Sequence, residues 1–204
     1  MRYFFAFALL ATTMAPVGAT AKDIPMVAIG LPFAPETPRP VAATHPLYHH
    51  ILVGEIEGLP STIGSSSLNF IRAAKRSSVN AALRETFQRM NLLALDDKAA
   101  HVRLEVSWGG NHTPFKIGTQ NVTTTTLHYR LVRIDTGQIL FNRDITTSAE
   151  GAGGDATMRD NGIVRASIAA NFASAANCLD RAAFGTAPGD CALTPEFSVS
   201  VVRR

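Results

Sequence analysis

The sequence predicts an α+β domain: a mainly antiparallel sheet of about four strands, with two helices packed on one face. Residues 121–147 alternate in polarity on both sides of a turn, and two longer segments carry apolar residues at helical spacing. The elements follow the order strand-helix-strand-strand-strand-helix. Because each helix has one apolar stripe to bury, packing both helices against one sheet face is the economical arrangement.

The hairpin over residues 121–147 is the clearest structural signal in the chain. Leu127, Tyr129 and Leu131 alternate with polar residues on the first arm, and the turn at residues 135–138 reads Asp-Thr-Gly-Gln. A period of two places alternate residues on one face of a strand, and aspartate and glycine are typical turn residues. We therefore expect two long strands at the centre of the domain.

The two helices are predicted at residues 72–92 and 155–183. Phe87 in the first and Phe172 in the second belong to apolar stripes that recur every three or four residues. Asn91 is suited to a left-handed cap at the end of the first helix.

Shorter patterns predict the two further strands of this order, and a third pattern near the C-terminus is compatible with one more short strand. Residues 48–58 are apolar in both phases, which favours a central strand, and residues 101–108 alternate strictly. Residues 197–202 are compatible with a short last strand, which the predicted order does not include. The stretches 59–67 and 109–118 are rich in glycine, serine or proline, so we expect loops there.

A secretory leader is predicted at residues 1–21. Arg2 precedes an apolar run at residues 3–10, and an Ala-Thr-Ala site ends at Ala21. These are the parts of a signal peptide, and the run is too short to span a bilayer. We expect cleavage after Ala21 and a periplasmic or secreted protein, with no transmembrane segment.

The mature chain is predicted to consist of a proline-rich extended segment, residues 22–46, and one α+β domain, residues 47–204. Prolines recur between residues 25 and 40, and apolar residues lie among them, so part of this segment should lie on the domain. The formal charge falls from +3 to +2 because Arg2 is the leader's one charged residue. This charge is too small to predict nucleic-acid binding.

Cys178 and Cys191 are the two cysteines of the chain. In an exported protein, two cysteines at this short spacing predict a disulfide. The alternative is a metal pair, but two ligands without a nearby histidine make a poor zinc site. Neither cysteine follows the leader, so no lipid anchor is predicted.

No catalytic, cofactor-binding or metal-binding residue is predicted. His45, His49 and His50 are the densest histidine group, but neighbours on a strand point to opposite faces and cannot easily share one ion. The glycine-rich residues 151–154 lack the complete dinucleotide and phosphate-loop motifs, so a connector is favoured over an anion site. No nucleophile motif is present, although residues distant in sequence can still form a triad.

Arg130 and Arg143 form the candidate partner surface. They lie on the two arms of the hairpin, where cross-strand clustering would create a site for an anionic envelope component. The alternative is an ordinary polar outer face of the sheet. Trp108 is predicted to lie in the core rather than in a ligand groove.

A family resemblance is carried by the helix around Phe87, the strand AAHVRLEV and the hairpin LHYRLVRIDTGQILFNRDI. Over residues 48–183 the chain resembles small Gram-negative envelope modules: the α+β domains of penicillin-binding-protein activator lipoproteins and of curli-channel and TolB N-terminal modules. The resemblance implies a binding or assembly role rather than catalysis. The chain departs from the lipoprotein members by lacking an anchoring cysteine.

The leading functional hypothesis is a non-enzymatic binding or assembly module of the cell envelope, whose partner is an envelope protein or an anionic envelope component. The alternative is a small-ligand-binding or hydrolytic protein that uses Trp108 and the predicted loops at residues 109–118 and 151–154.

Overall fold

The computed structural model describes residues 40–64, 72–114, 118, 120–152, 156–183 and 197–200. Within them, five strands form the main sheet and two strands form a small separate sheet. The elements in chain order are β1 (Ile51–Glu57), β2 (Thr62–Gly64), β3 (Arg72–Lys75), α1 (Arg76–Arg89), β4 (Val102–His112), β5 (Gln120–Arg133), β6 (Ile139–Ala152), α2 (Ala156–Ala183) and β7 (Phe197–Ser200). The α+β class is confirmed.

The main sheet has the strand order β1-β4-β5-β6-β7 and is mixed. Strands β4, β5 and β6 are antiparallel neighbours, whereas β1 pairs in parallel with β4 and β7 pairs in parallel with β6. The prediction of a mainly antiparallel sheet is corrected accordingly. Each parallel pair is joined through a helix, which returns the chain to the end of the sheet where the previous strand began.

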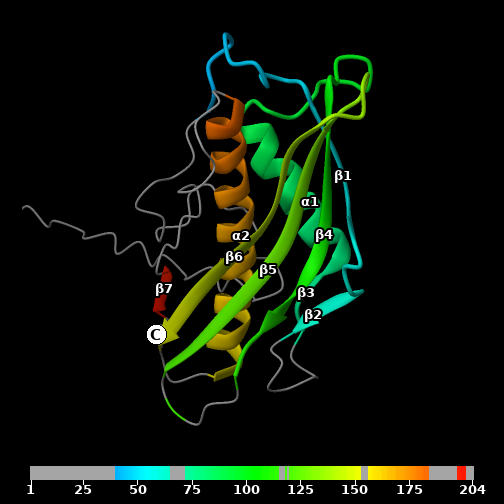
Figure 1. Ribbon diagram of the computed structural model, residues 1–204. Helices are drawn as coiled ribbons and strands as arrows, with labels where there is room; N and C mark the ends of the chain where they lie inside the picture. Colours follow the sequence, from blue (N-terminus) through cyan, green and yellow to red (C-terminus); the bar gives the residue numbers. More distant parts are fainter. Residues whose placement is uncertain are drawn as a thin grey trace, which may run out of the picture.

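Both helices cover one face of the main sheet and contact each other, as predicted (Figure 1). The topology explains this arrangement. Strands β1, β4, β6 and β7 point the same way, and both helical crossovers move in the same direction across the sheet. Because such crossovers are almost always right-handed, both must pass over the same face.

The core lies between this face and the helices. Phe87 of α1, Phe172 of α2 and Leu104, Leu127 and Tyr129 of the sheet are fully buried. The apolar stripes predicted from sequence therefore pack against the strands, and the predicted hairpin is confirmed as β5 and β6. Asn91 has a φ of 59°, which confirms the left-handed cap after α1.

Strand β1 lies at an edge of the sheet, so the predicted central position is wrong. Its pairing with β4 shifts between Val53 and Ile56, and Ile51, Val53 and Ile56 are all buried. An irregularity of this kind reverses the phase of a strand, so apolar residues in both sequence phases face the same core.

Two predicted boundaries also differ from the structure. Residues 72–75 form β3, paired with β2, where a helix start and a loop were expected. Strand β4 continues to His112 through a register shift at Gly109, where a loop was expected. A Cβ at Gly109 would lie 2.9 Å from the Thr126 carbonyl oxygen, so the glycine marks a close approach of two strands rather than a turn.

Candidate functional site

The middle of β5 places polar residues on both faces of the sheet. Four consecutive threonines, residues 123–126, alternate between the helix-covered inner face and the outer face. Thr123 and Thr125 are fully buried, whereas Thr124 and Thr126 are partly exposed. The strand therefore has two polar surfaces, one inside the protein and one outside.

On the inner face, Asn171 of α2 is the centre of a buried hydrogen-bond network. Its Oδ1 accepts a bond from the Tyr129 hydroxyl at 2.7 Å. Its amide nitrogen donates to the carbonyl oxygens of Ile145 and Thr125, at 2.7 and 3.2 Å, and to Thr147 Oγ1 at 3.2 Å. A satisfied buried network of this kind fixes the register of a helix against its strands.

Ser167 continues this network one turn earlier on α2. Asn111 Nδ2 donates to Thr125 Oγ1 at 2.9 Å, and Thr125 Oγ1 lies 2.6 Å from Ser167 Oγ. The Ser167 hydroxyl donates in turn to the Val164 carbonyl oxygen. The Ser167 carbonyl accepts a bond from Thr147 Oγ1 at 2.7 Å. We call Thr125, Tyr129, Thr147, Ser167 and Asn171 the inner polar seam.

Burial raises the pKa of the Tyr129 hydroxyl well above its ordinary value. The cause is desolvation, which disfavours the charged phenolate. With its proton held in a bond to Asn171, this tyrosine is a structural donor rather than a base. The seam thus contributes to packing specificity.

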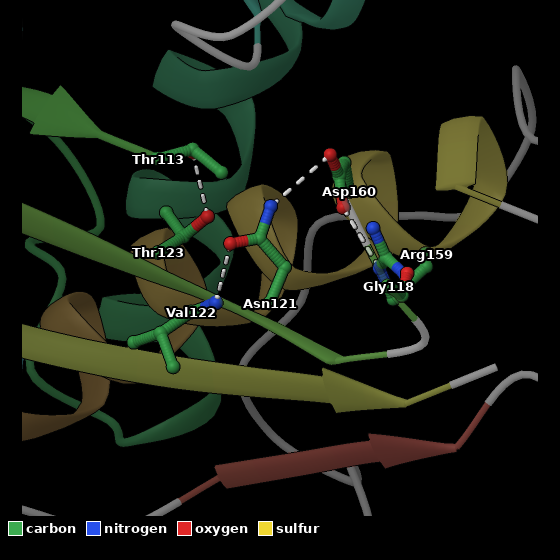
Figure 2. A network of polar contacts seen from close by, with 7 residues as sticks. All are labelled: Thr113, Gly118, Asn121, Val122, Thr123, Arg159 and Asp160. Carbon is green, nitrogen blue, oxygen red and sulfur yellow. Dashed lines mark hydrogen bonds and ion pairs between the residues drawn. The ribbon is translucent and has the colours of Figure 1, made fainter. Parts of the chain in front are cut away.

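A second buried network joins the start of α2 to the chain between β4 and β5 (Figure 2). Arg159 is 1% exposed; its Nε donates to Asp160 Oδ1 at 2.9 Å and its Nη1 donates to the Gly118 carbonyl at 2.7 Å. Asn121 Nδ2 donates to Asp160 Oδ2 at 3.3 Å. Buried charges are tolerated when they are paired and hydrogen-bonded, as they are here.

The same network ties the strand ends together. Thr113 Oγ1 lies 2.7 Å from Thr123 Oγ1, and Asn121 Oδ1 accepts the Val122 backbone N–H at 2.9 Å. Sequence reasoning missed the Arg159–Asp160 pair. The available signal was two adjacent charges directly before the apolar run at residues 163–164.

On the outer face, charged side chains of β4, β5 and β6 pair along β4 and across the strands. Arg130 Nη1 donates to Glu105 Oε2 at 2.9 Å, and Arg103 reaches Glu105 Oε1 at 2.8 Å. His128 Nδ1 lies 2.7 Å from Asp144 Oδ1. We call these five residues the outer charged row; they lie on the face of the sheet opposite to α1 and α2.

The predicted cluster of Arg130 and Arg143 does not form. In the register of β5 and β6, Arg130 is opposite Asn142 and Arg143 is opposite Tyr129, a buried inner residue. Because successive residues of a strand point to opposite faces, Arg130 lies on the outer face and Arg143 in the inner phase. A role of either residue in partner binding stays a prediction.

Ser107, His128 and Asp144 occupy one row across three strands. Ser107 is opposite His128 in the β4–β5 register, and His128 is opposite Asp144 in the β5–β6 register. These are the residue types of a hydrolytic triad, brought together from distant positions. The histidine is 39% exposed and the aspartate 71% exposed, so the row lies open to water. Burial, which strengthens such interactions in enzymes, is missing at the histidine and the aspartate.

The histidine group near β1 bonds to the backbone. His49 Nδ1 and His50 Nδ1 lie 2.9 Å from the carbonyl oxygens of Leu93 and Ala99, and His45 Nδ1 accepts the Leu47 backbone N–H. Within the part of the chain that the structure describes, no group of three potential ligands is placed to hold a metal ion.

Trp108, Gly151 and Cys178, which the sequence also singled out, lie in the core or in regular secondary structure. Trp108 packs against the core, as predicted. Gly151 lies within β6, and residues 153–154 lie outside the described residues. Cys178 is buried on α2, whereas Cys191 lies outside the described residues, so their disulfide stays a prediction. No helix among the described residues is long and apolar enough to cross a membrane.

Comparison with solved structures shows the fold. Protein XCC0632 from Xanthomonas campestris, described with the family model DUF330, matches with a TM-score of 0.57 and 9% identity, over 72% of this chain and 92% of that chain. This identity supports a shared fold alone. No family model matches this chain, and no curated protein matches it in sequence.

Two other structures are weaker matches. A candidate lipoprotein from Caulobacter crescentus has a TM-score of 0.41 and 10% identity, over 67% of this chain and 88% of that chain. Lipoprotein GNA1162 from Neisseria meningitidis has a TM-score of 0.24 and 20% identity, over 37% and 60% of the two chains. Both are too distant to carry an argument about this chain. The resemblance to activator, curli-channel and TolB modules is not confirmed by these structures.

Proposed function

We propose that this protein is an exported, non-enzymatic binding or assembly module of the cell envelope, and that the outer charged row is its contact surface. The predicted leader at residues 1–21 supports export. The row supports binding, because it places paired charges on a sheet face opposite to both helices. A rigid sheet presents these side chains with little ordering cost on association.

One part of the row favours an anionic partner. The row as a whole pairs two arginines with two carboxylates, and its positive charge lies where Arg103, Glu105 and Arg130 meet. Arg103 and Arg130 share a single carboxylate, that of Glu105, so this trio keeps one net positive charge. Such a surface attracts anions over a range that salt shortens. An anionic envelope component or an acidic protein surface is therefore the partner class that the geometry favours.

The test is charge reversal at Arg130. We expect Arg130→Glu to weaken binding to lipid-free envelope extract immobilised on beads by about tenfold, because it places two like charges beside each other and removes the positive charge of the trio. Binding of the parent should also weaken between 0.05 and 0.5 M NaCl. Co-sedimentation at a series of protein concentrations measures both effects.

The matched control is Arg84→Glu. Arg84 is an exposed arginine of α1, in the helical layer on the other side of the sheet. It should bind as the parent does, and both variants should keep the parent melting temperature. Equal binding by Arg130→Glu and the parent would show that the outer charged row is not the contact surface.

A second function, hydrolysis, is favoured by one observation, the Ser107–His128–Asp144 row. Its test is ester hydrolysis by the purified protein, compared with Ser107→Ala and His128→Ala. Activity that both substitutions abolish would support an enzyme. Activity that persists in both variants, or that is absent from the parent, would reject the row as a catalytic site.

A further inference from the structure

One end of the domain exposes large apolar side chains. Among the described residues, Leu95 is 79% exposed, Ile134 47%, Ile139 48% and Leu140 42%. Three of these lie at the tip of the β5–β6 hairpin, and Leu95 lies in the segment that leads into β4. Apolar residues of this size are ordinarily scattered singly on a protein surface, so their concentration at one end is informative.

Backbone bonds hold this tip in place. Arg133 N–H donates to the Gln138 carbonyl at 2.9 Å, and Gly137 N–H donates to the Arg133 carbonyl at 3.0 Å. Ile134 N–H donates to the His101 carbonyl at 3.0 Å, which joins the tip to the segment that carries Leu95. The exposed apolar side chains are thus carried by hydrogen-bonded backbone. We call Leu95, Ile134, Ile139 and Leu140 the apolar end.

The chain enters the domain at the same end (Figure 1). Val41 N–H donates to the Met90 carbonyl at 3.0 Å, and Asn91 Nδ2 donates to the Val41 carbonyl at 3.3 Å. Asn91 also precedes the segment that leads to Leu95. The chain therefore enters the described domain at the end that carries the apolar side chains. The sequence before residue 40 includes the predicted leader and apolar residues among prolines between residues 24 and 33.

We propose that the apolar end inserts into the surface of a lipid bilayer. The apolar side chains lie on the β5–β6 hairpin and on the segment before β4, at one end of the domain, and apolar side chains exposed at one end suit the interfacial region of a bilayer. Arg133 is paired with Asp135 at 3.3 Å, and Asp96, Asp97 and Lys98 follow Leu95, so these charges leave no net positive charge at the apolar end to attract anionic lipid. Burial of apolar surface, rather than attraction to anionic lipid, drives the association. Vesicle binding should consequently depend little on salt, unlike binding through the outer charged row.

Vesicle flotation of the full chain, expressed with its leader, tests this inference. The probes are vesicles of phosphatidylethanolamine with phosphatidylglycerol, and vesicles of phosphatidylcholine alone. We expect the parent to float with both, at 0.1 and 0.5 M NaCl alike. Ile139→Ser combined with Leu140→Ser should lower the bound fraction about tenfold, because membrane affinity scales with buried apolar area.

Two controls make the result specific. Arg84→Glu changes an exposed charge on α1, outside both the apolar end and the outer charged row, and should float as the parent does. Flotation with pure lipid vesicles and binding to lipid-free envelope extract are separate measurements, so the failure of this inference is distinguishable from the failure of the proposed function. Both serine-substituted positions are exposed, so the double variant should keep the parent melting temperature. A double variant that floats as well as the parent would overturn the inference.

Depth measurement gives an independent readout. In a Trp108→Phe background, Leu140→Trp places the chain's one indole at the apolar end. Brominated lipids should quench its fluorescence in vesicles, and Trp108 of the parent should be quenched much less. A parent chain that binds no vesicles, or that instead uses Ile139 and Leu140 to bind a protein partner, would overturn the inference.

Discussion

The inner polar seam and the outer charged row lie on opposite faces of the same two strands. Thr125 and Thr126 are adjacent in sequence, yet Thr125 is buried against Ser167 of α2 and Thr126 pairs with Thr146 on the outer face. Both hydroxyls make a hydrogen bond inside the protein. The two threonines differ in their access to water. If its hydrogen bond is broken, Thr126 can bond to water instead, whereas buried Thr125 cannot.

This comparison separates structural from functional polarity. A buried polar group left without a partner costs about 1–3 kcal/mol, whereas an exposed group exchanges its partner for water at little net cost. Seam residues should therefore control stability. Outer residues should have small effects on stability and remain available for binding.

The largest effect is expected at the buried ion pair of Figure 2. Arg159→Met should lower the free energy of unfolding by about 3–5 kcal/mol, because it leaves the Asp160 carboxylate buried without its cationic partner. Urea denaturation followed by circular dichroism measures this. The double variant Arg159→Met with Asp160→Leu should recover part of the loss, since it removes both charges. A single variant as stable as the parent would refute the structural role of the pair.

A smaller effect is expected for Tyr129→Phe in the seam. The substitution leaves Asn171 Oδ1 without its donor and should lower the free energy of unfolding by about 1–3 kcal/mol at neutral pH. The same denaturation measurement applies.

Tyr129 also predicts the direction of a pH dependence. Its folded-state pKa is raised above the value of about 10 for an unfolded tyrosine, so the folded state holds the proton more tightly. The associated stability is present below about pH 10 and is lost as the pH rises further. Tyr129→Phe should lose less stability than the parent between pH 9 and 11; an equal loss would contradict the assignment.

The smallest effects come from the two adjacent threonines. Thr125→Val removes the oxygen that links Asn111 and Ser167 and should cost about 1–2 kcal/mol. Thr126→Val keeps a β-branched side chain on the outer face and should stay within about 0.5 kcal/mol of the parent. Thermal denaturation of both variants makes the comparison. Similar losses in both would show that the two faces do not differ as proposed.

The elements that were predicted well have local causes. Alternation in β5 and β6, the stripe around Phe87 and the cap at Asn91 each depend on residues close together in the chain. The parallel pairing of β1 with β4 and of β7 with β6 depends on the path of each helix across the sheet. No local sequence pattern records that path. The irregularity in β1 likewise made an edge strand resemble a central one.

The candidate site divides in the same way. Arg130 was recognised from sequence as an exposed cation of the hairpin, but its partner Glu105 and its separation from Arg143 depend on register. A shift of one residue in pairing exchanges the faces of a strand, so sequence spacing alone cannot decide which side chains meet.

By itself, the sequence determined the α+β class, the central hairpin, both helices and the expectation of export, because these follow from local periodicity and composition. Only the tertiary structure decided that the sheet is mixed, that Arg159 and Asp160 are buried together, and that one strand has a structural and an outer polar face. The physical reason is that burial and cross-strand pairing join residues far apart in the chain. These contacts determine whether a threonine of β5 contributes to stability, as Thr125 does, or remains available at the surface, as Thr126 does.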